Sequence, residues 1–597
     1  MRQTSFSGWI HAGVLLVLVV VAYGAALANG YVWDDGYFIQ GSVGFDSFGA
    51  ALDRAFSPLF PDRAYVRPLP LFSLYLETLP LGRNATVTHA FNLILHAGCV
   101  LLVYMVALGQ LGRAKAVSHR HVALIVAAMF AVHPALVEAV AWMSSRFDLM
   151  VTFFMLSGLA AASRIHRQVP MVLTVSTSFF LAALCKESAV VFPFVLFVFE
   201  YLRRRQETPA STPLQFLNEP RSRWLFLGLV LAGLAYLLVR HLILGNGYTS
   251  LDDQSIGLPD RLARASSGPW VYCSKTGLPW LGLSPQHTFI YDAAAWRGRY
   301  LLVAVFSVAV LGATAFLLIK GRFAGWIMVA VLAAYLPVLH LLSLTIGNNL
   351  VHERFMYFPT AVLFAGLPAF VHELRLTEKA RRSLLFIATL WIVVSIVVTR
   401  SVVPLWKDEL SLWEWGTRMD PLSDVAAANL IYSYLQQHRF DDMNKVYRDM
   451  EESGMPITVE TLTNMGNGRQ GVGDYRGALD FYQRAASGVG AVSELRLAPL
   501  YANMSVAYMM IGENEKAREA LLASLHYNPR HFISIGTLYA YCDGEEVDAS
   551  RFNPADMPGA RKYMELMRIQ LGTRSEEARA NPNADASLCP AEYLRAK

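Results

Sequence analysis

Eleven apolar segments lie within the first 403 residues, and they restrict the fold more than any other feature of the sequence. A helix needs about 20 mostly apolar residues to cross the hydrocarbon core of a bilayer. We therefore predict that residues 1–403 form an all-α, polytopic membrane domain. The predicted transmembrane segments are 9–28, 90–111, 122–142, 147–163, 169–184, 188–202, 224–244, 300–319, 324–345, 355–371 and 384–402.

Residues 404–597, in contrast, have the composition of a soluble domain. The whole chain is 54% hydrophobic and only 16% charged, with a mean hydropathy of +0.35. Soluble proteins carry about 25% charged residues, so a fully soluble protein is excluded. The net charge of +5 is modest and no long basic run is present, so we expect no nucleic-acid partner.

Lysine and arginine gather in the even-numbered connections between the predicted spans. These residues are Arg113, Lys115, Arg120, Arg164, Arg167, Arg203, Arg204, Arg205, Arg221, Arg223, Lys320, Arg322, Arg375, Lys379, Arg381 and Arg382. Cytoplasmic loops carry such an excess. We therefore predict a cytoplasmic N-terminus. The large loops 29–89 and 245–299 and the C-terminal domain then face the periplasm of a bacterial inner membrane, or the endoplasmic reticulum lumen in a eukaryote.

The C-terminal domain contains an internal repeat. Three segments align on Asn429, Asn464 and Asn503, with spacings of 35 and 39 residues, and each leads into a turn and a second helical pattern. A period near 34 residues is typical of tetratricopeptide helix pairs, which stack into an α-solenoid. We expect this domain to bind a protein acceptor or partner; a rigid lid or a dimer contact is the alternative. The longer spacing predicts an insertion near 488–494.

Five cysteines are present, and no Cys or His spacing predicts a zinc site. Cys542 and Cys589 lie in the exported domain, where a disulfide between them is one alternative and two free thiols the other.

Ionisable residues cluster where the predicted spans meet the periplasmic side. They are Asp34, Asp35, Arg67, Glu138, Arg146, Asp148, Lys186, Glu187, His352, Glu353 and Arg354. Arginine and lysine suit a phosphate group, and a carboxylate suits removal of a proton from a hydroxyl. Each group alone has a simpler interpretation: a solvated acidic pair, an interfacial ion pair, or an arginine that extends to lipid headgroups. Their gathering at one membrane face favours a site for a phospholipid-linked substrate.

Several of these residues fall in short motifs that occur in a fixed order. The motifs are Trp33-Asp34-Asp35, Arg67-Pro68-Leu69, Asn92-Leu93-Ile94-Leu95-His96, His133-Pro134, Glu138-Ala139-Val140-Ala141-Trp142, Arg146-Phe147-Asp148-Leu149, Lys186-Glu187, Leu283-Ser284-Pro285 and Glu353-Arg354-Phe355-Met356-Tyr357. As a set they resemble the motifs of the transmembrane and tetratricopeptide repeat-containing O-mannosyltransferases, within the GT-C class of membrane glycosyltransferases. The resemblance covers nearly the whole chain.

The resemblance implies a GT-C fold and transfer of a sugar from a polyprenyl-phosphate donor to a protein Ser or Thr, with inversion at the anomeric carbon. It implies that Asp34 or Asp35 is the general base, without choosing between them. Arg67, Arg146, Lys186, His352 and Arg354 become candidate contacts for the donor, supported by Glu138, Asp148, Glu187 and Glu353. No metal or other cofactor is required by these residues, although a carboxylate-bound divalent ion stays open.

Two departures from the family leave alternatives. Only about three repeats are clear, and the short loops leave the sugar open between mannose, arabinofuranose and others. The acceptor could be a lipid or glycan instead of a protein. A transporter or flippase would have ionisable residues at mid-bilayer and broken helices related by an internal repeat, neither of which is clear in the sequence. A repeat-based assembly platform would need fewer spans than this chain has.

Overall fold

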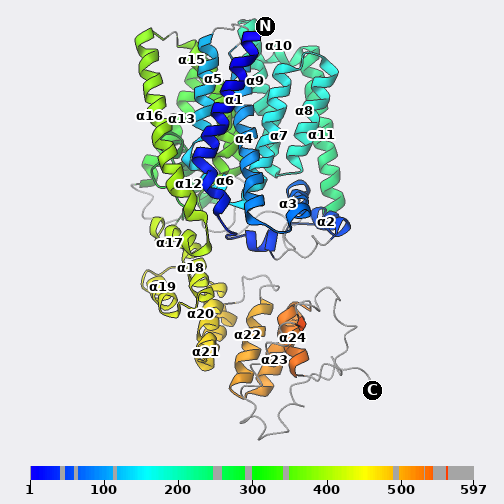
Figure 1. The fold of residues 1–597 in the computed structure, drawn as a ribbon, viewed down its shortest axis with the longest axis vertical. Coiled ribbons are helices and arrows are strands. Elements are labelled where there is room, and N and C mark those ends of the chain that lie inside the picture. Colours follow the sequence, from blue (N-terminus) through cyan, green and yellow to red (C-terminus); the bar gives the residue numbers. More distant parts are fainter. Residues whose placement is uncertain are drawn as a thin grey trace. The chain divides into compact units, whose positions relative to one another are not determined.

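The computed structural model describes residues 2–40, 47–59, 65–111, 117–245, 258–289, 299–340, 349–374, 376–488, 497–529, 531–541 and 560–561. These residues are almost entirely helical, and the described parts hold one isolated β-bridge, Thr288–Asn349. The contacts divide the chain into two units, Met1–Asp420 and Pro421–Lys597 (Figure 1). The sequence places the domain boundary at 403/404, where the last apolar segment ends. The first unit also contains the helix that follows.

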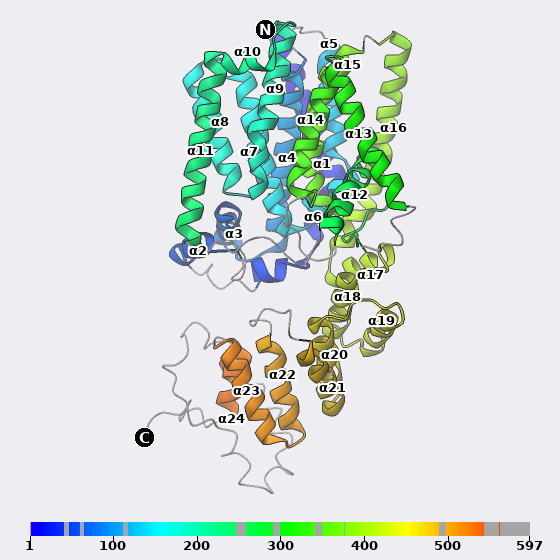
Figure 2. The same ribbon diagram turned by 180° about the vertical axis from the view of Figure 1, so that it is seen from behind.

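The first unit is a bundle of helices (Figures 1 and 2). Its α-helices are α1 (Arg2–Tyr23), α2 (Phe48–Ala55), α3 (Pro68–Leu81), α4 (Ala85–Gly109), α5 (Val117–Ala131), α6 (Val137–Ala141), α7 (Arg146–Arg164), α8 (Gln168–Ala183), α9 (Phe192–Glu207), α10 (Pro213–Asn218), α11 (Pro220–Leu244), α12 (Leu258–Gly277), α13 (Arg299–Ile319), α14 (Phe323–Tyr335), α15 (Tyr357–Glu373), α16 (Glu378–Val402) and α17 (Glu409–Met419). Both views place α10 beside the N-terminal end of α1, and α2 and α3 at the opposite end of the bundle.

Each of the eleven predicted spans contains an α-helix, although 341–345 of the span 324–345 lie outside the described residues. Seven helical stretches among the described residues are long and apolar enough to cross a membrane. They are Gly8–Ala28, Ala85–Gly109, Met143–Arg164, Pro220–Leu244, Leu301–Ile319, Glu353–Val371 and Glu378–Trp406. Helices α8 and α14 are apolar but shorter, and α9 ends in three arginines. The prediction of several helices that are long and apolar enough to span a membrane is confirmed, whereas the eleven crossings and their orientation stay predictions.

The predicted span 122–142 is not one straight helix. Arg120–Ala131 and Pro134–Ala141 are bent by 55° relative to one another. Pro134 has no N–H to continue the helical ladder, and it disfavours helical geometry at His133. The His133 ring instead accepts the backbone N–H of Ala135 at 3.3 Å and so starts the second piece.

Burial differs strongly between the apolar helices. The most apolar windows of α11, α13 and α16 are only 17%, 11% and 22% buried, whereas that of α7 is 83% buried. Side chains such as Leu242, Leu302 and Phe386 are 70–74% exposed. In a bundle of this composition such exposed apolar faces suit contact with lipid, while α7 lies in the interior.

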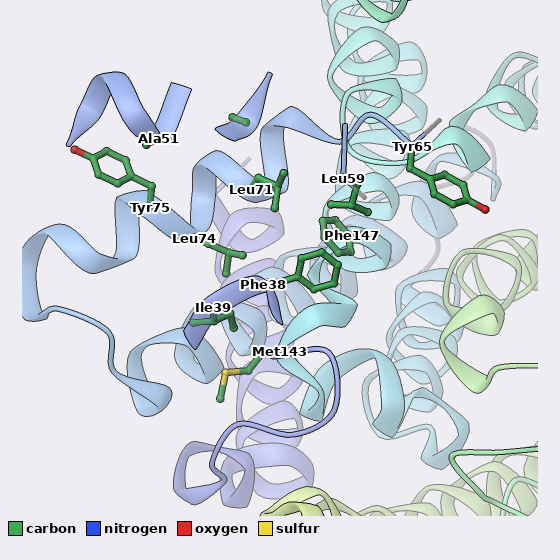
Figure 3. Packing of buried hydrophobic residues seen from close by; sticks show 11 residues of the cluster. Phe38, Ile39, Ala51, Leu59, Tyr65, Leu71, Leu74, Tyr75, Met143 and Phe147 are labelled. Carbon is green, nitrogen blue, oxygen red and sulfur yellow. The ribbon is translucent and has the colours of Figure 1, made fainter. Parts of the chain in front are cut away.

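The segment after α1 packs against the beginning of α7 through a buried hydrophobic cluster (Figure 3). Phe38 and Phe147 meet edge to face, with ring centroids 5.6 Å apart. Leu71, Leu74 and Tyr75 add the buried face of α3 to the same cluster. This packing fixes the first loop beside the residues that follow α6.

The second unit begins with three helix hairpins. They are α18 (Asp424–Gln436) with α19 (Phe440–Glu452), α20 (Val459–Gly471) with α21 (Tyr475–Ser487), and α22 (Leu497–Met510) with α23 (Asn514–Tyr527), followed by α24 (Phe532–Tyr541). Each internal turn has a left-handed residue at the same place: His438, Gly473 and Gly512. The N–H of the next residue then donates to the carbonyl five residues earlier at 2.9–3.0 Å. The repeated helix pairs are therefore present, while the predicted insertion lies mostly in 489–496, outside the described residues, as do Cys542 and Cys589.

Candidate active site

A pocket of about 170 Å³ lies where the loops of the first unit converge, and seven of the eleven predicted site residues line it. They are Asp34, Arg67, Asp148, Lys186, Glu187, His352 and Arg354. Their positions come from five places in the chain: the segment after α1, the start of α3, the start of α7, the turn before α9 and the turn before α15. The expected gathering of distant charged residues is therefore present in the fold.

Asp34 and Asp35 lie in different surroundings, and the backbone turns at Trp33 immediately before them. Trp33 has φ = 56°, a left-handed conformation that is uncommon for a bulky residue. Asp34 lines the pocket, and within the described residues its carboxylate accepts no hydrogen bond and forms no ion pair. Burial raises its pKa, against the opposing charge of Arg354. Asp34 is thus the carboxylate of the pair that lines the pocket.

Asp35 is fully buried and is not among the residues that line the pocket. Its Oδ1 accepts the N–H and the hydroxyl of Ser144 at 2.8 and 2.5 Å, and its Oδ2 accepts the Val32 N–H at 3.0 Å. Burial raises the pKa of Asp35 to about 7, although these hydrogen bonds oppose the shift. Asp35 therefore joins the first loop to the residues before α7.

Three cations line the pocket, and each has a carboxylate partner. Arg67 donates to Glu187 through Nε and Nη2 at 3.2 and 3.0 Å. Lys186 meets Asp148 at 2.5 Å. Arg354 meets the buried Glu138, which lies behind the pocket lining. Each cation keeps N–H donors beyond those used in its pair, because guanidinium has five and ammonium has three.

The pKa values of Lys186 and His352 are both lowered from the ordinary values of their residue types. Burial, assisted by Arg67 and Arg354, lowers the pKa of Lys186 to about 8, although Asp148 opposes this. Burial and the Arg354 charge lower the pKa of His352 to about 4, with Glu138 opposing from 3.4 Å. At neutral pH His352 is therefore a neutral hydrogen-bonding group, so it suits a sugar hydroxyl better than a phosphate charge.

Aromatic rings pack against the pocket cations Lys186 and Arg354. Trp33 stacks on Trp142 with centroids 4.7 Å apart and an interplanar angle of 13°. The Arg354 guanidinium lies 4.8 Å from the Trp142 ring centroid, and Lys186 Nζ lies 4.8 Å from that of Phe355. Such cation–π contacts hold flexible side chains in one orientation. Trp33 and Trp142 belong to the sequence motifs, but no role for either ring could be predicted from the sequence.

Arg146 does not reach the pocket. It is 2% exposed, forms an ion pair with Glu77 of α3, and donates to Asn92 Oδ1 at 2.9 Å and the Thr88 carbonyl at 3.1 Å, both in α4. Residues two apart on a helix point in different directions, so Asp148 faces the pocket while Arg146 faces away. In the structure Arg146 joins α3, α4 and α7, and the predicted donor contact at Arg146 stays a prediction.

Glu353 likewise lies outside the pocket lining. It is buried with Lys275 of α12 at 2.9 Å, accepts the Ser284 N–H at 3.0 Å, and approaches His287 at 3.3 Å. Glu353 therefore ties residues 275–287 to the turn that carries His352 and Arg354.

A metal was left open by the sequence. Among the side chains that the structure describes, no group of three or more His, Cys, Asp or Glu residues is arranged to hold a metal ion. Searches against protein-family models, curated proteins and solved structures found no match to this chain.

Proposed function

We propose that the protein is a membrane glycosyltransferase of the GT-C class, which transfers a sugar from a polyprenyl-phosphate donor to a hydroxyl at the periplasmic face of a bacterial inner membrane. The observation that carries this proposal is the Asp34 carboxylate, which has no partner among the described residues, in a pocket that also presents Arg67, Lys186 and Arg354. A carboxylate that can accept a proton and cations with spare donors are the two groups that glycosyl transfer from a phosphate requires.

In the proposed reaction, ionised Asp34 takes the proton of the acceptor hydroxyl. The acceptor oxygen attacks the anomeric carbon, and the bond from that carbon to the phosphate oxygen breaks with its electron pair, which leaves polyprenyl phosphate. Attack opposite the leaving group inverts the anomeric centre. The spare N–H groups of Arg67, Lys186 and Arg354 stabilise the charge that develops on the phosphate.

An apolar cavity supports a lipid-linked donor. It measures about 330 Å³ and is lined by residues of α12, α13, α14 and α15, among them Tyr272, Met328, Leu332 and Leu363. Tyr335 and Leu339 line this cavity, while Pro337, Val338 and His340 of the same segment line the charged pocket. Residues 335–340 thus contribute to both spaces, and we propose that an amphipathic donor places its phosphate in one and part of its isoprenoid chain in the other.

A protein acceptor is favoured by the second unit. Its three helix hairpins are of the length and order of tetratricopeptide repeats, which bind peptides. The alternative is the same chemistry on a lipid or glycan. Deletion of residues 421–597 distinguishes the two kinds of acceptor. Loss of protein modification with unchanged hydrolysis of the donor supports a protein acceptor. Unchanged transfer to a lipid or glycan supports a lipid or glycan acceptor.

The bend between α5 and α6 favours a second function, a transporter or flippase, because broken helices form substrate sites in such proteins. The decisive experiment incubates the purified protein with polyprenyl-phosphate mannose, arabinofuranose and other defined sugars, together with peptide and lipid acceptors, and detects products by mass spectrometry. Transfer by the wild type and not by Asp34→Asn supports the glycosyltransferase. The glycosyltransferase proposal would be refuted if the protein moved a labelled lipid across vesicle membranes and transferred no sugar, and if Asp34→Asn retained this movement.

A further inference from the structure

The segment that carries Asp34 is bonded to the residues that follow the last apolar helix. The Asn29 amide donates to the Val403 carbonyl at 3.1 Å, and the Gly30 N–H donates to the Lys407 carbonyl at 2.8 Å. A Cβ atom at Gly30 would lie 3.1 Å from that carbonyl oxygen, so the close approach favours glycine. The first loop and residues 403–413 therefore form one packed junction.

Glu409, at the start of α17, completes this junction at Trp33. Its Oε1 accepts the Trp33 backbone N–H at 2.6 Å, and its Oε2 accepts the indole N–H of Trp413 at 2.6 Å. Trp413 is fully buried, and its ring meets the Trp33 ring edge to face at 5.1 Å. One carboxylate thus joins a buried ring of α17 to the residue immediately before Asp34.

The bond to Trp33 matters because Trp33 is the left-handed residue of the turn. A bulky residue is disfavoured in this region and persists there where surrounding contacts impose the conformation. Asp35 holds the turn from one side through Ser144, and Glu409 holds it from the other. Relaxation of φ at Trp33 would rotate the peptide that follows and move the Asp34 carboxylate out of the pocket.

We propose that Glu409 is a positioning residue, which holds the Trp33 turn so that Asp34 faces the acceptor. This inference rests on the proposed function of Asp34 as the base. An ionised carboxylate satisfies both N–H donors, whereas a glutamine in its place has one acceptor oxygen and one NH₂ group, so one donor would face another donor. Glu414, on the same helix, lies outside the pocket lining and supplies the matched control.

The test compares wild type, Glu409→Gln, Trp413→Phe and Glu414→Gln. Since a misplacement of about 1 Å can cost 10²-fold in rate, we expect Glu409→Gln to lower kcat about 10–100-fold. KM for the donor should stay within about twofold, because no donor-binding group is changed. Trp413→Phe, which removes only the second N–H donor, should give a smaller loss. Glu414→Gln should leave both constants unchanged.

Hydrogen exchange separates this inference from the proposed function. The Trp33 amide is held by Glu409, so its exchange should quicken in Glu409→Gln and not in Glu414→Gln, whether or not the protein transfers sugar. Faster exchange together with a loss confined to kcat supports the inference. Unchanged exchange, unchanged kcat, or a rise in KM equal to the fall in kcat would overturn it. A wild type that transfers no sugar would refute the base role of Asp34 and leave the exchange result to decide whether Glu409 holds the turn.

Discussion

Asp34 and Asp35 are neighbours in the chain, yet their carboxylates have different surroundings. Asp35 is enclosed by bonds from Val32 and Ser144, and Asp34 faces the pocket. Adjacent acidic residues usually suggest a shared role, such as a paired metal ligand. Here, at the left-handed turn of Trp33, the Asp35 carboxylate is held in buried hydrogen bonds and the Asp34 carboxylate lines the pocket.

Asp34→Asn should abolish transfer while the protein stays folded. A positioned base contributes about 10²–10⁴-fold, so kcat should fall by that factor. Donor binding should change little, because the cations stay in place. Transfer assays and binding of a labelled donor measure the two effects separately. Full activity of Asp34→Asn would remove Asp34 from the mechanism.

Asp35 should make stability depend on pH. Its pKa is about 7 in the folded protein and near 3.8 in the unfolded chain, so the protonated form is favoured by folding. That contribution is complete below pH 3.8 and is lost as the pH rises towards 7. Between pH 5 and pH 7.5 the melting temperature of the wild type should therefore fall relative to that of Asp35→Asn. A difference in melting temperature that stays constant with pH would contradict this expectation.

Lys186 should make donor binding sensitive to alkaline pH. Because its pKa is about 8, the side chain loses its positive charge between pH 7 and pH 9. KM for the anionic donor should rise several-fold over this range. Lys186→Arg should flatten the rise, since guanidinium stays charged. A KM that is independent of pH in the wild type would show that Lys186 does not contact the phosphate.

Arg146→Gln should affect stability rather than donor binding. The substitution leaves Glu77 buried without its cation, and breaking a buried pair in this way costs about 3–5 kcal/mol. Thermal unfolding in detergent should show a large loss. The matched variant Arg67→Gln should instead raise KM for the donor. If Arg146→Gln raised KM for the donor with no loss of stability, this result would support the predicted contact between Arg146 and the donor.

Gly466→Ala should destabilise the second unit. A Cβ atom there would lie 2.3 Å from Cε1 of Tyr482, a fully buried ring. Overpacking of this kind costs about 1–3 kcal/mol. Gly488→Ala, whose Cβ would meet atoms no closer than 3.6 Å, is the control. Hydrogen exchange across 459–487 compares the two, and equal protection in both variants would contradict the packing argument.

The sequence predicts the helices because their signals are local. Runs of apolar residues and the repeat around Asn429, Asn464 and Asn503 give helices at the expected places. The sequence predicts 122–142 as one span, whereas Pro134, which lacks an N–H, breaks the helix there. The lengths of α8 and α14 depend on where helices end, which hydropathy alone defines poorly.

The site could be predicted only in part, because tertiary contacts decide which way each side chain points. Lys186 and Asp148 were both candidates, but their pairing depends on how α7 packs beside the turn before α9. Arg146 shares a motif with Asp148 and faces another direction. Glu409 was missed because a single glutamate after the last span gives no signal; its role depends on contact with a residue far away in the chain.

The matched ion pairs of the pocket have a consequence for selectivity. Arg67, Lys186 and Arg354 are already offset by Glu187, Asp148 and Glu138, so the empty pocket has no large positive potential to attract soluble anions. Inorganic phosphate and nucleotide sugars, which are abundant in cells, should compete poorly for it. Affinity must then come mainly from the apolar chain, and the protein would discriminate its donor by the lipid more than by the phosphate.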